Sequence, residues 1–211
     1  AEAQGVAGLF KQTVGPRKMN KNPESFVWET PFDNLYLMPS SPTLGQIEKE
    51  LEARYKIYKL RDAIAKLDGE YDRIYIDTPP NFNFYSKSAL IAADSVLVPF
   101  DCDSFARNSL YDLTANIEEL QEDHNPDLII EGIVINQFNA QARLPGELVA
   151  ELKNEGFPVI DTYLTSSVKM RESHHEMKPL VYLAPTHKLT QTYLDLHARL
   201  EKGVKKLRKG R

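Results

Sequence analysis

The chain has 211 residues, a net charge of −4 and 42% apolar residues, which fits one folded domain and excludes an intrinsically disordered chain. A single cysteine, Cys102, excludes an intrachain disulfide framework. No apolar run is long enough to cross a bilayer and no signal-peptide pattern opens the chain, so we expect a cytoplasmic protein with no membrane contact.

The first third of the chain predicts one strand and one long helix. Residues 1–34 hold scattered glycine, proline, asparagine and lysine, which predicts mostly loop. The apolar run Leu35–Met38 predicts a short buried strand. Apolar residues then recur at steps of three and four from Leu44 to Leu67, and Gly69 follows, which predicts a single helix.

Strands and helices alternate in the remaining chain. Apolar runs predict strands at Arg73–Asp77, Ser95–Phe100, Leu128–Asn136 and Val159–Leu164. Helical spacing predicts helices over about 104–122, 145–156 and 189–204. Most of the strands are continuous apolar runs, which is typical of strands covered on both faces. We therefore expect an α/β fold with an open, mostly parallel sheet and helices on both faces.

We expect one domain over residues 1–201 and a basic tail over 202–211. The tail carries only cations among its charged residues: Lys202, Lys205, Lys206, Arg208, Lys209 and Arg211. Two interpretations stay open, a nucleic-acid contact and a solvated end. The tail offers only Val204 and Leu207 as bulky apolar residues, which favours nucleic acid over a membrane-binding helix.

Polar residues follow the predicted strands at their carboxyl ends, where ligands bind in such a sheet. The candidates are Ser40, Ser41, Asp77, Thr78, Asp101, Asp103, Asn136, Gln137, Thr165 and Ser166. Asp77 ends an apolar strand and is not expected in the core, because burying a bare carboxylate is too costly. A carboxylate at such a strand end can hold the water shell of Mg²⁺, although a helix cap or loop carboxylate is an open alternative.

The segment YDRIYIDTPPNFNFYSKSALIAADSVLVPFDCD, residues 71–103, resembles the ParA/MinD/Soj family of nucleotide-dependent ATPases. That family has a D-x-P-P turn after the magnesium-side strand and then an A-A-D-x-V-L-V-P strand, which read DTPP and AADSVLVP here. Further matches are YLMPSSPTLGQIEKELEAR, EGIVINQFNAQARL and VKMRESHHEMKPLVYLAP. The resemblance extends from about residue 30 to about residue 200.

The resemblance implies ATP and Mg²⁺ as ligands, with slow hydrolysis in an ATP-dependent homodimer. Asp77 would be the magnesium-side acid, and Thr78 and Pro79 would belong to the switch turn that senses the γ-phosphate. Asn136 would hydrogen-bond the adenine, because an amide offers a donor and an acceptor in one plane. Thr165 would line the other side of the base, although YLTSS replaces the family's proline-containing turn.

The family's phosphate-binding loop, K-G-G-x-x-K-T, has no match in this sequence. Backbone N–H groups and lysines of that loop hold the phosphates. We therefore expect that this chain alone lacks ATPase activity and leaves a sheet edge and a core face uncovered. Three explanations stay open: a fragment of a longer gene product, numbering that begins downstream, or natural loss of the loop.

The resemblance to ParA implies plasmid or chromosome partitioning, non-specific DNA binding at the nucleoid and a ParB-like partner. The candidate DNA-binding cations are Lys169, Arg171, Lys178, Lys202, Lys205, Lys206 and Arg208. Such side chains contact phosphates rather than bases. Two alternatives stay open, a family relative that positions another cargo, as MinD does, and a binding or regulatory module that pairs with an intact ATPase.

Overall fold

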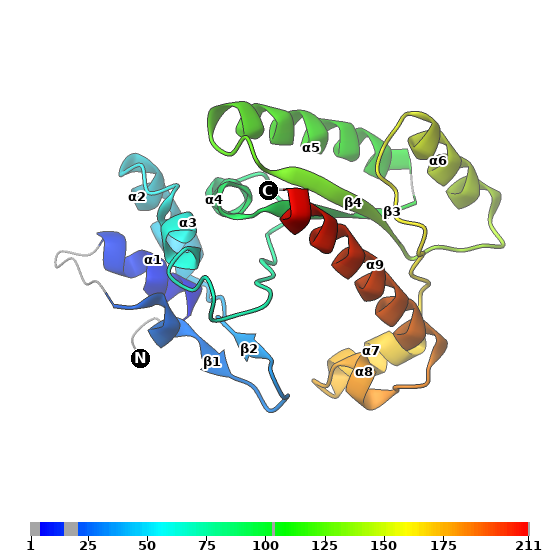
Figure 1. Ribbon diagram of the computed structural model, residues 1–211, viewed down its shortest axis with the longest axis horizontal. Helices are drawn as coiled ribbons and strands as arrows, with labels where there is room; N and C mark the ends of the chain where they lie inside the picture. The colour runs from blue at the N-terminus through cyan, green and yellow to red at the C-terminus, as the bar shows by residue number, and fades with distance from the viewer. Residues whose placement is uncertain (1–4, 15–20, 103, 211) are drawn as a thin grey trace. The chain divides into compact units, whose positions relative to one another are not determined.

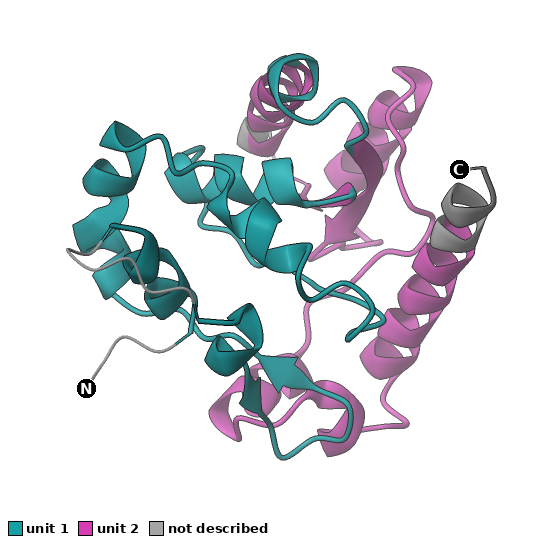
Figure 2. Ribbon diagram, turned by 60° about the vertical axis from the view of Figure 1, so that its left-hand side comes forward, with its two compact units in different colours: residues 1–94, 119–128 teal, residues 95–118, 129–211 magenta. Residues whose placement is uncertain are grey.

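The computed structural model describes residues 5–14, 21–102 and 104–210, with the backbone alone at 104–105 and 204–210 (Figure 1). The chain forms two compact units, residues 1–94 with 119–128 and residues 95–118 with 129–211 (Figure 2). Each unit has its own clusters of buried apolar side chains. That residues 1–201 make up one domain stays a prediction.

The first unit is mainly helical. Its elements are α1 (Val6–Val14), the 3-10 helix η1 (Pro23–Phe26), β1 (Trp28–Glu29), β2 (Tyr36–Leu37), α2 (Thr43–Ala53), α3 (Lys59–Ile64) and α4 (Phe84–Ala92). Phe10 of α1, Leu51 of α2 and Phe84 of α4 belong to one buried cluster. The rings of Phe10 and Phe84 meet edge to face, with their centroids 5.9 Å apart. Burial of each such side chain stabilises the fold by roughly 1.5–3 kcal/mol.

The start of the chain differs from our prediction. Residues 1–34 were expected to be mostly loop, but Val6–Val14 forms α1 and buries Leu9, Phe10 and Val14. Phe10 and Val14 are four residues apart and therefore share one face of the helix. Leu35–Met38 was expected to be a buried strand, but only Tyr36–Leu37 is a strand, and it is exposed. It pairs antiparallel with β1, whose side chains are exposed too.

The predicted helix from Leu44 to Leu67 is two helices, α2 and α3. The break lies at Tyr55, whose φ of 54° is in the left-handed region that side chains disfavour. The Tyr55 N–H donates to the Glu52 carbonyl at 2.9 Å, and the Lys56 N–H donates to the Leu51 carbonyl at 3.0 Å. These two bonds form a Schellman motif, which ends α2 although glycine usually occupies the left-handed position.

The second unit contains a parallel sheet. Its elements are β3 (Ser95–Asp101), α5 (Ser104–Asp123, its last residues belonging to the first unit), β4 (Ile129–Asn136), α6 (Arg143–Asn154), α7 (Val168–His175), α8 (Leu180–Leu183) and α9 (Lys188–Gly210). Strands β3 and β4 pair in parallel, with Val98 opposite Ile133.

An extended segment over 158–164 continues the sheet beside β4. The Ile160 and Leu164 N–H groups donate to the carbonyls of Ile133 and Ile135, at 3.0 and 2.9 Å. Gly132 allows this close approach, because a Cβ there would lie 2.6 Å from the Ile160 side chain. The predicted strand Val159–Leu164 is therefore present as a paired segment with a single bridge, between Val159 and Ile133.

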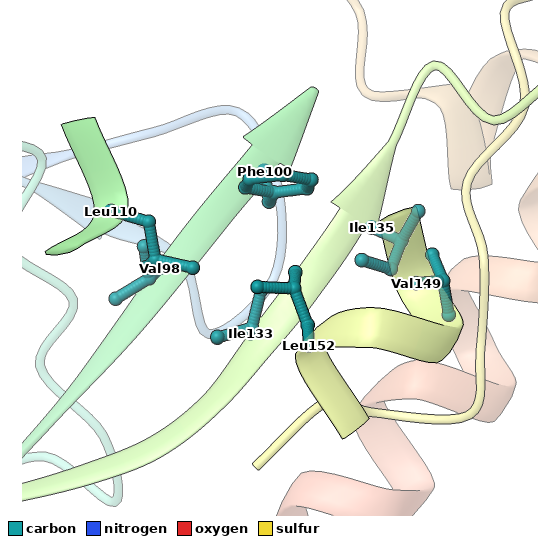
Figure 3. Close-up of a cluster of buried hydrophobic side chains, with 7 residues drawn as sticks. All are labelled: Val98, Phe100, Leu110, Ile133, Ile135, Val149 and Leu152. Carbon is teal, nitrogen blue, oxygen red and sulfur yellow. The ribbon is translucent and has the colours of Figure 1, made fainter. Parts of the chain in front are cut away.

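Helices cover both faces of this sheet. Successive residues of a strand point to opposite faces. Ile133 and Ile135 pack with side chains of α5 and α6, as Figure 3 shows. Val134, between them, packs with Leu180 of α8 and Leu189 of α9. The predicted α/β fold with a parallel sheet and helices on both faces is confirmed.

The predicted strand Arg73–Asp77 is wrong. The segment is extended, but none of the strands in the described ranges pairs with it. Ile74 and Tyr75 are exposed by 42% and 69%. An extended segment becomes a strand only when a neighbouring segment takes up its backbone hydrogen bonds, so the apolar pattern alone is insufficient.

Candidate nucleotide site

The best-formed part of the predicted site lies at the carboxyl ends of β3 and β4. Asp101 ends β3 and stands opposite Asn136, which ends β4. The Asn136 Nδ2 donates to Asp101 Oδ1 at 2.9 Å. The Gln137 Nε2 donates to Asp101 Oδ2 at 2.8 Å. Both carboxylate oxygens of the half-buried Asp101 thus accept a hydrogen bond from an amide.

The backbone after β4 brings the third parallel segment to this cluster. Gln137 has φ of 50°, in the left-handed region, so the chain turns directly after the strand. The Phe138 N–H then donates to the Leu164 carbonyl at 2.8 Å. Thr165 follows Leu164 and is exposed. Asp101, Asn136 and Thr165 therefore mark the carboxyl ends of three neighbouring parallel segments.

This arrangement suits recognition of a flat polar ligand. The Asn136 amide has two N–H groups, and one of them donates to Asp101. Its second N–H and its carbonyl oxygen lie in one plane, which matches the edge of a purine base. The sequence predicted that Asn136 lies at a strand end. It gave no sign that the Asp101 carboxylate accepts hydrogen bonds from both Asn136 and Gln137.

The predicted magnesium-side residues lie in the first unit. Asp77, Thr78 and Pro79 are exposed in the extended segment that precedes α4. Mg²⁺ keeps several waters and takes one or two protein carboxylates together with phosphate oxygens, so a single exposed aspartate fits that role. Asp77 belongs to one unit and Asn136 to the other. A nucleotide shared by the two residues therefore stays a prediction.

Ser86 anchors the predicted switch turn to α4. The side chain of Asn83 caps this helix by accepting from the Tyr85 and Ser86 N–H groups, at 3.1 and 3.2 Å. The buried Ser86 hydroxyl lies 2.6 Å from the Asn81 carbonyl and 3.3 Å from the Pro79 carbonyl. Sequence reasoning missed Ser86. The cap residue Asn83 was recognisable, because asparagine is a preferred residue directly before a helix start, but the contacts of the Ser86 hydroxyl with the turn were not.

Groups of three or more His, Cys, Asp or Glu side chains that could hold a metal ion are absent from the described part of the chain. Asp103, a strand-end candidate, lies outside the described residues.

The candidate DNA-binding cations are described to different extents. Lys169, Arg171 and Lys178 are exposed on and directly after α7, and Lys169 pairs with Glu172 at 2.6 Å. Lys202 is exposed on α9. The side chains of Lys205, Lys206, Arg208 and Lys209 lie outside the described residues, as does the whole of Arg211. The predicted tail continues α9 as helix up to Gly210.

No described helix is both long enough and apolar enough to cross a membrane. Helix α9, which contains most of the basic tail, has 23 residues but a strongly polar sequence.

Comparison with known proteins decides the family. A family profile described as an AAA domain matches residues 10–130, more than half of the chain. The chromosome partitioning protein ParA of Myxococcus xanthus is 33% identical over 196 residues, which cover 90% of this chain and 68% of that protein. The chain belongs to the ParA/MinD family. The family resemblance predicted from the sequence is confirmed, and at family level it indicates a nucleotide hydrolase.

Solved structures share the fold of this ParA/MinD-family chain. Cobyrinic acid a,c-diamide synthase from Mycobacterium smegmatis, solved with a bound ATP analogue and magnesium, is 26% identical with a TM-score of 0.65. The match covers 70% of this chain and 61% of the synthase. Apo McdA of Cyanothece has a TM-score of 0.80 at 18% identity, over 97% of this chain and 79% of McdA, which shows a shared fold. The ParA/MinD-family chain thus spans about two thirds of the synthase and of the Myxococcus ParA protein.

Proposed function

We propose that this chain supplies the base-binding edge and the magnesium-side acid of a partition ATPase. The proposal rests on one observation. At the carboxyl end of β4, the Asn136 Nδ2 donates a hydrogen bond to the Asp101 carboxylate at 2.9 Å. Ligands of open α/β sheets bind at such strand ends. The ATP analogue and magnesium bound to the Mycobacterium smegmatis relative support ATP and Mg²⁺ as the ligands.

Each residue of the proposed site has its own role in binding the nucleotide. Asn136 binds the adenine edge, and Thr165 lines the base from the neighbouring segment. Asp77 holds the water shell of Mg²⁺, and Thr78 and Pro79 respond to the terminal phosphate. The bound Mg²⁺ neutralises charge on the phosphates. Residues 1–211 alone are not expected to hydrolyse ATP, because their sequence contains no phosphate-binding loop.

The cellular role proposed is segregation of plasmid or chromosomal DNA. ATP holds a homodimer together, the dimer coats nucleoid DNA without sequence preference, and a ParB-like partner stimulates hydrolysis. The similarity to the chromosome partitioning protein ParA supports this role. The exposed cations Lys169, Arg171, Lys178 and Lys202 supply phosphate contacts. The sequence adds Lys205, Lys206 and Arg208 as further candidates for phosphate contacts.

A DNA-binding assay on the full-length gene product tests the role. We expect ATP to raise the affinity for random-sequence duplex DNA, and added salt to lower it steeply, because cationic contacts release counterions from DNA. The variant Arg171→Ala should weaken binding equally for different sequences, whereas Lys59→Ala, which removes a cation paired with Asp62 in the first unit, should not. DNA affinity that is indifferent to ATP would rule out the partition role.

Two alternative functions stay open for this chain. The first is a binding or regulatory module that pairs with an intact ATPase. The second is a family relative that positions another cargo. Titration of ATP into the 211-residue chain tests the first alternative. A module that has its own base-binding edge but no phosphate-binding loop should bind ATP weakly and should not hydrolyse it.

A further inference from the structure

The amide of Asn136 has a fixed orientation. A free asparagine side chain can present either its NH₂ group or its oxygen to a ligand, since the two ends of the amide have nearly the same shape. The Asp101 carboxylate only accepts hydrogen bonds, so the NH₂ end of the amide must face it. The bond of 2.9 Å between Nδ2 and Oδ1 shows this orientation. The carbonyl oxygen of Asn136 therefore points away from Asp101.

The Asp101 carboxylate is itself held in place. Its second oxygen accepts from the Gln137 Nε2 at 2.8 Å. The left-handed backbone at Gln137, with φ of 50°, brings that side chain back toward the strand end. Strained backbone of this kind persists only where the surroundings hold it, and it concentrates at binding sites. Asp101 and Gln137 thus form a support for the Asn136 amide.

A fixed amide distinguishes the two purine bases. Adenine presents an amino donor beside the N7 acceptor, whereas guanine presents a carbonyl acceptor at that position. An outward carbonyl oxygen on Asn136 accepts from the adenine amino group and meets the guanine carbonyl as acceptor against acceptor. Rotating the amide would reverse this preference, but rotation would turn its oxygen toward the Asp101 carboxylate.

We propose that Asp101 is a positioning residue that sets adenine over guanine by holding the orientation of the Asn136 amide. The inference rests on the proposed function of Asn136 as the base-binding residue. Asp101 is then a specificity determinant on a different strand. It lies 35 residues from Asn136 in the sequence and directly opposite Asn136 in the sheet.

The variant Asp101→Asn tests the proposal in the full-length gene product. Asparagine at this position can accept from or donate to Asn136, so both orientations of the Asn136 amide become possible. We expect the ratio of the Kd values for GTP and ATP to fall about tenfold, in line with the loss of one oriented hydrogen bond. The control Asp161→Asn removes another carboxylate of the same unit, bonded to Lys153, and should leave the ratio unchanged.

A second readout needs no nucleotide. In NMR spectra of the 211-residue chain, the Asn136 side-chain NH₂ signals should shift in Asp101→Asn and stay in place in Asp161→Asn. The serine side chain in Asp101→Ser is too short to reach the amide, so this variant should also lower the GTP-to-ATP ratio and shift the Asn136 signals. The proposal can therefore still be tested if one of the two variants folds poorly. A merely structural role for Asp101 would lower the melting temperature without changing the GTP-to-ATP ratio.

The outcomes separate the two proposals. If the unmodified full-length protein binds neither ATP nor GTP, the proposed function fails, and the NMR signals alone report whether Asp101 orients the amide. If ATP binds and the folded Asp101 variants keep the original GTP-to-ATP ratio, the specificity role of Asp101 is overturned.

Discussion

Single residues of this chain divide into those that the sequence revealed and those that only the fold reveals. The position of Asn136 at a strand end was predictable because it ends an apolar run, whereas its role toward a nucleotide stays a prediction. Asp101 was visible as a strand-end carboxylate, but its bond to Asn136 depends on the register of β3 against β4. Register follows from packing of both sheet faces, which a single sequence does not determine.

Ser86 offers a test at the residue scale. Its hydroxyl is 6% exposed and lies 2.6 Å from the Asn81 carbonyl, in the turn that follows Asp77. Replacing Ser86 with alanine removes this donor from a partly buried hydrogen bond, so we expect a loss of about 1 kcal/mol in the free energy of unfolding. Urea denaturation measures it.

The matched control is Ser25→Ala. The Ser25 hydroxyl also donates to a backbone carbonyl, that of Asn22 at 2.7 Å, but it is exposed to water. Its loss should cost less than about 0.5 kcal/mol, because water replaces the bond. Equal losses in the two variants would show that Ser86 does not anchor the turn.

Tyr85 gives the first unit a pH dependence. Burial, and next the charges of Glu48 and Glu52, raise the pKa of the Tyr85 hydroxyl to about 12. This hydroxyl donates to the Leu44 carbonyl at 2.5 Å. The pKa is higher in the folded chain, so the stabilisation is complete below the unfolded pKa of about 10 and disappears as pH rises toward 12.

We therefore expect the free energy of unfolding to fall more steeply between pH 10 and 12 in the unmodified chain than in Tyr85→Phe. Denaturant titrations at several pH values measure the difference between the two slopes. Identical slopes would mean that Tyr85 titrates alike in the folded and unfolded chain.

Whole elements were predictable where pattern and packing agree. The continuous apolar runs at 95–100 and 128–136 predicted β3 and β4, which are covered on both faces. The helix predicted from Leu44 to Leu67 failed, because its apolar spacing continues through a break that has no glycine. The strand predicted at Arg73–Asp77 failed because pairing depends on a neighbouring segment.

The break between α2 and α3 offers a test at this scale. Tyr55 is 89% exposed and has φ of 54°, so its side chain adds strain and little packing. Tyr55→Gly should stabilise the chain by about 0.5–1 kcal/mol, because glycine adopts the left-handed region without a steric penalty. The control Lys49→Gly, at an exposed position inside α2, should destabilise by about 1 kcal/mol. Destabilisation by both substitutions would contradict the Schellman motif.

The molecule as a whole combines a covered sheet with exposed apolar segments. In the second unit, helices pack on both faces of β3 and β4. In the first unit, Leu37, Ile74 and Tyr75 are each more than 40% exposed. The sheet edge and core face that we expect to be uncovered without a phosphate-binding loop stay a prediction. The fold class was predictable from the alternation of strands and helices, and the family from the order of its motifs. That Arg73–Asp77 has no pairing strand in the described ranges was not predictable.

Binding of ATP by variants of the full-length gene product tests the central claim, that Asp77 and Asn136 serve one nucleotide. Calorimetric titrations with and without Mg²⁺ would compare Asn136→Ala and Asp77→Ala. Asn136→Ala should weaken ATP binding about tenfold in both conditions, because it removes hydrogen bonds to the base. Asp77→Ala should weaken binding only when Mg²⁺ is present. Unchanged ATP affinity in both variants would contradict the account.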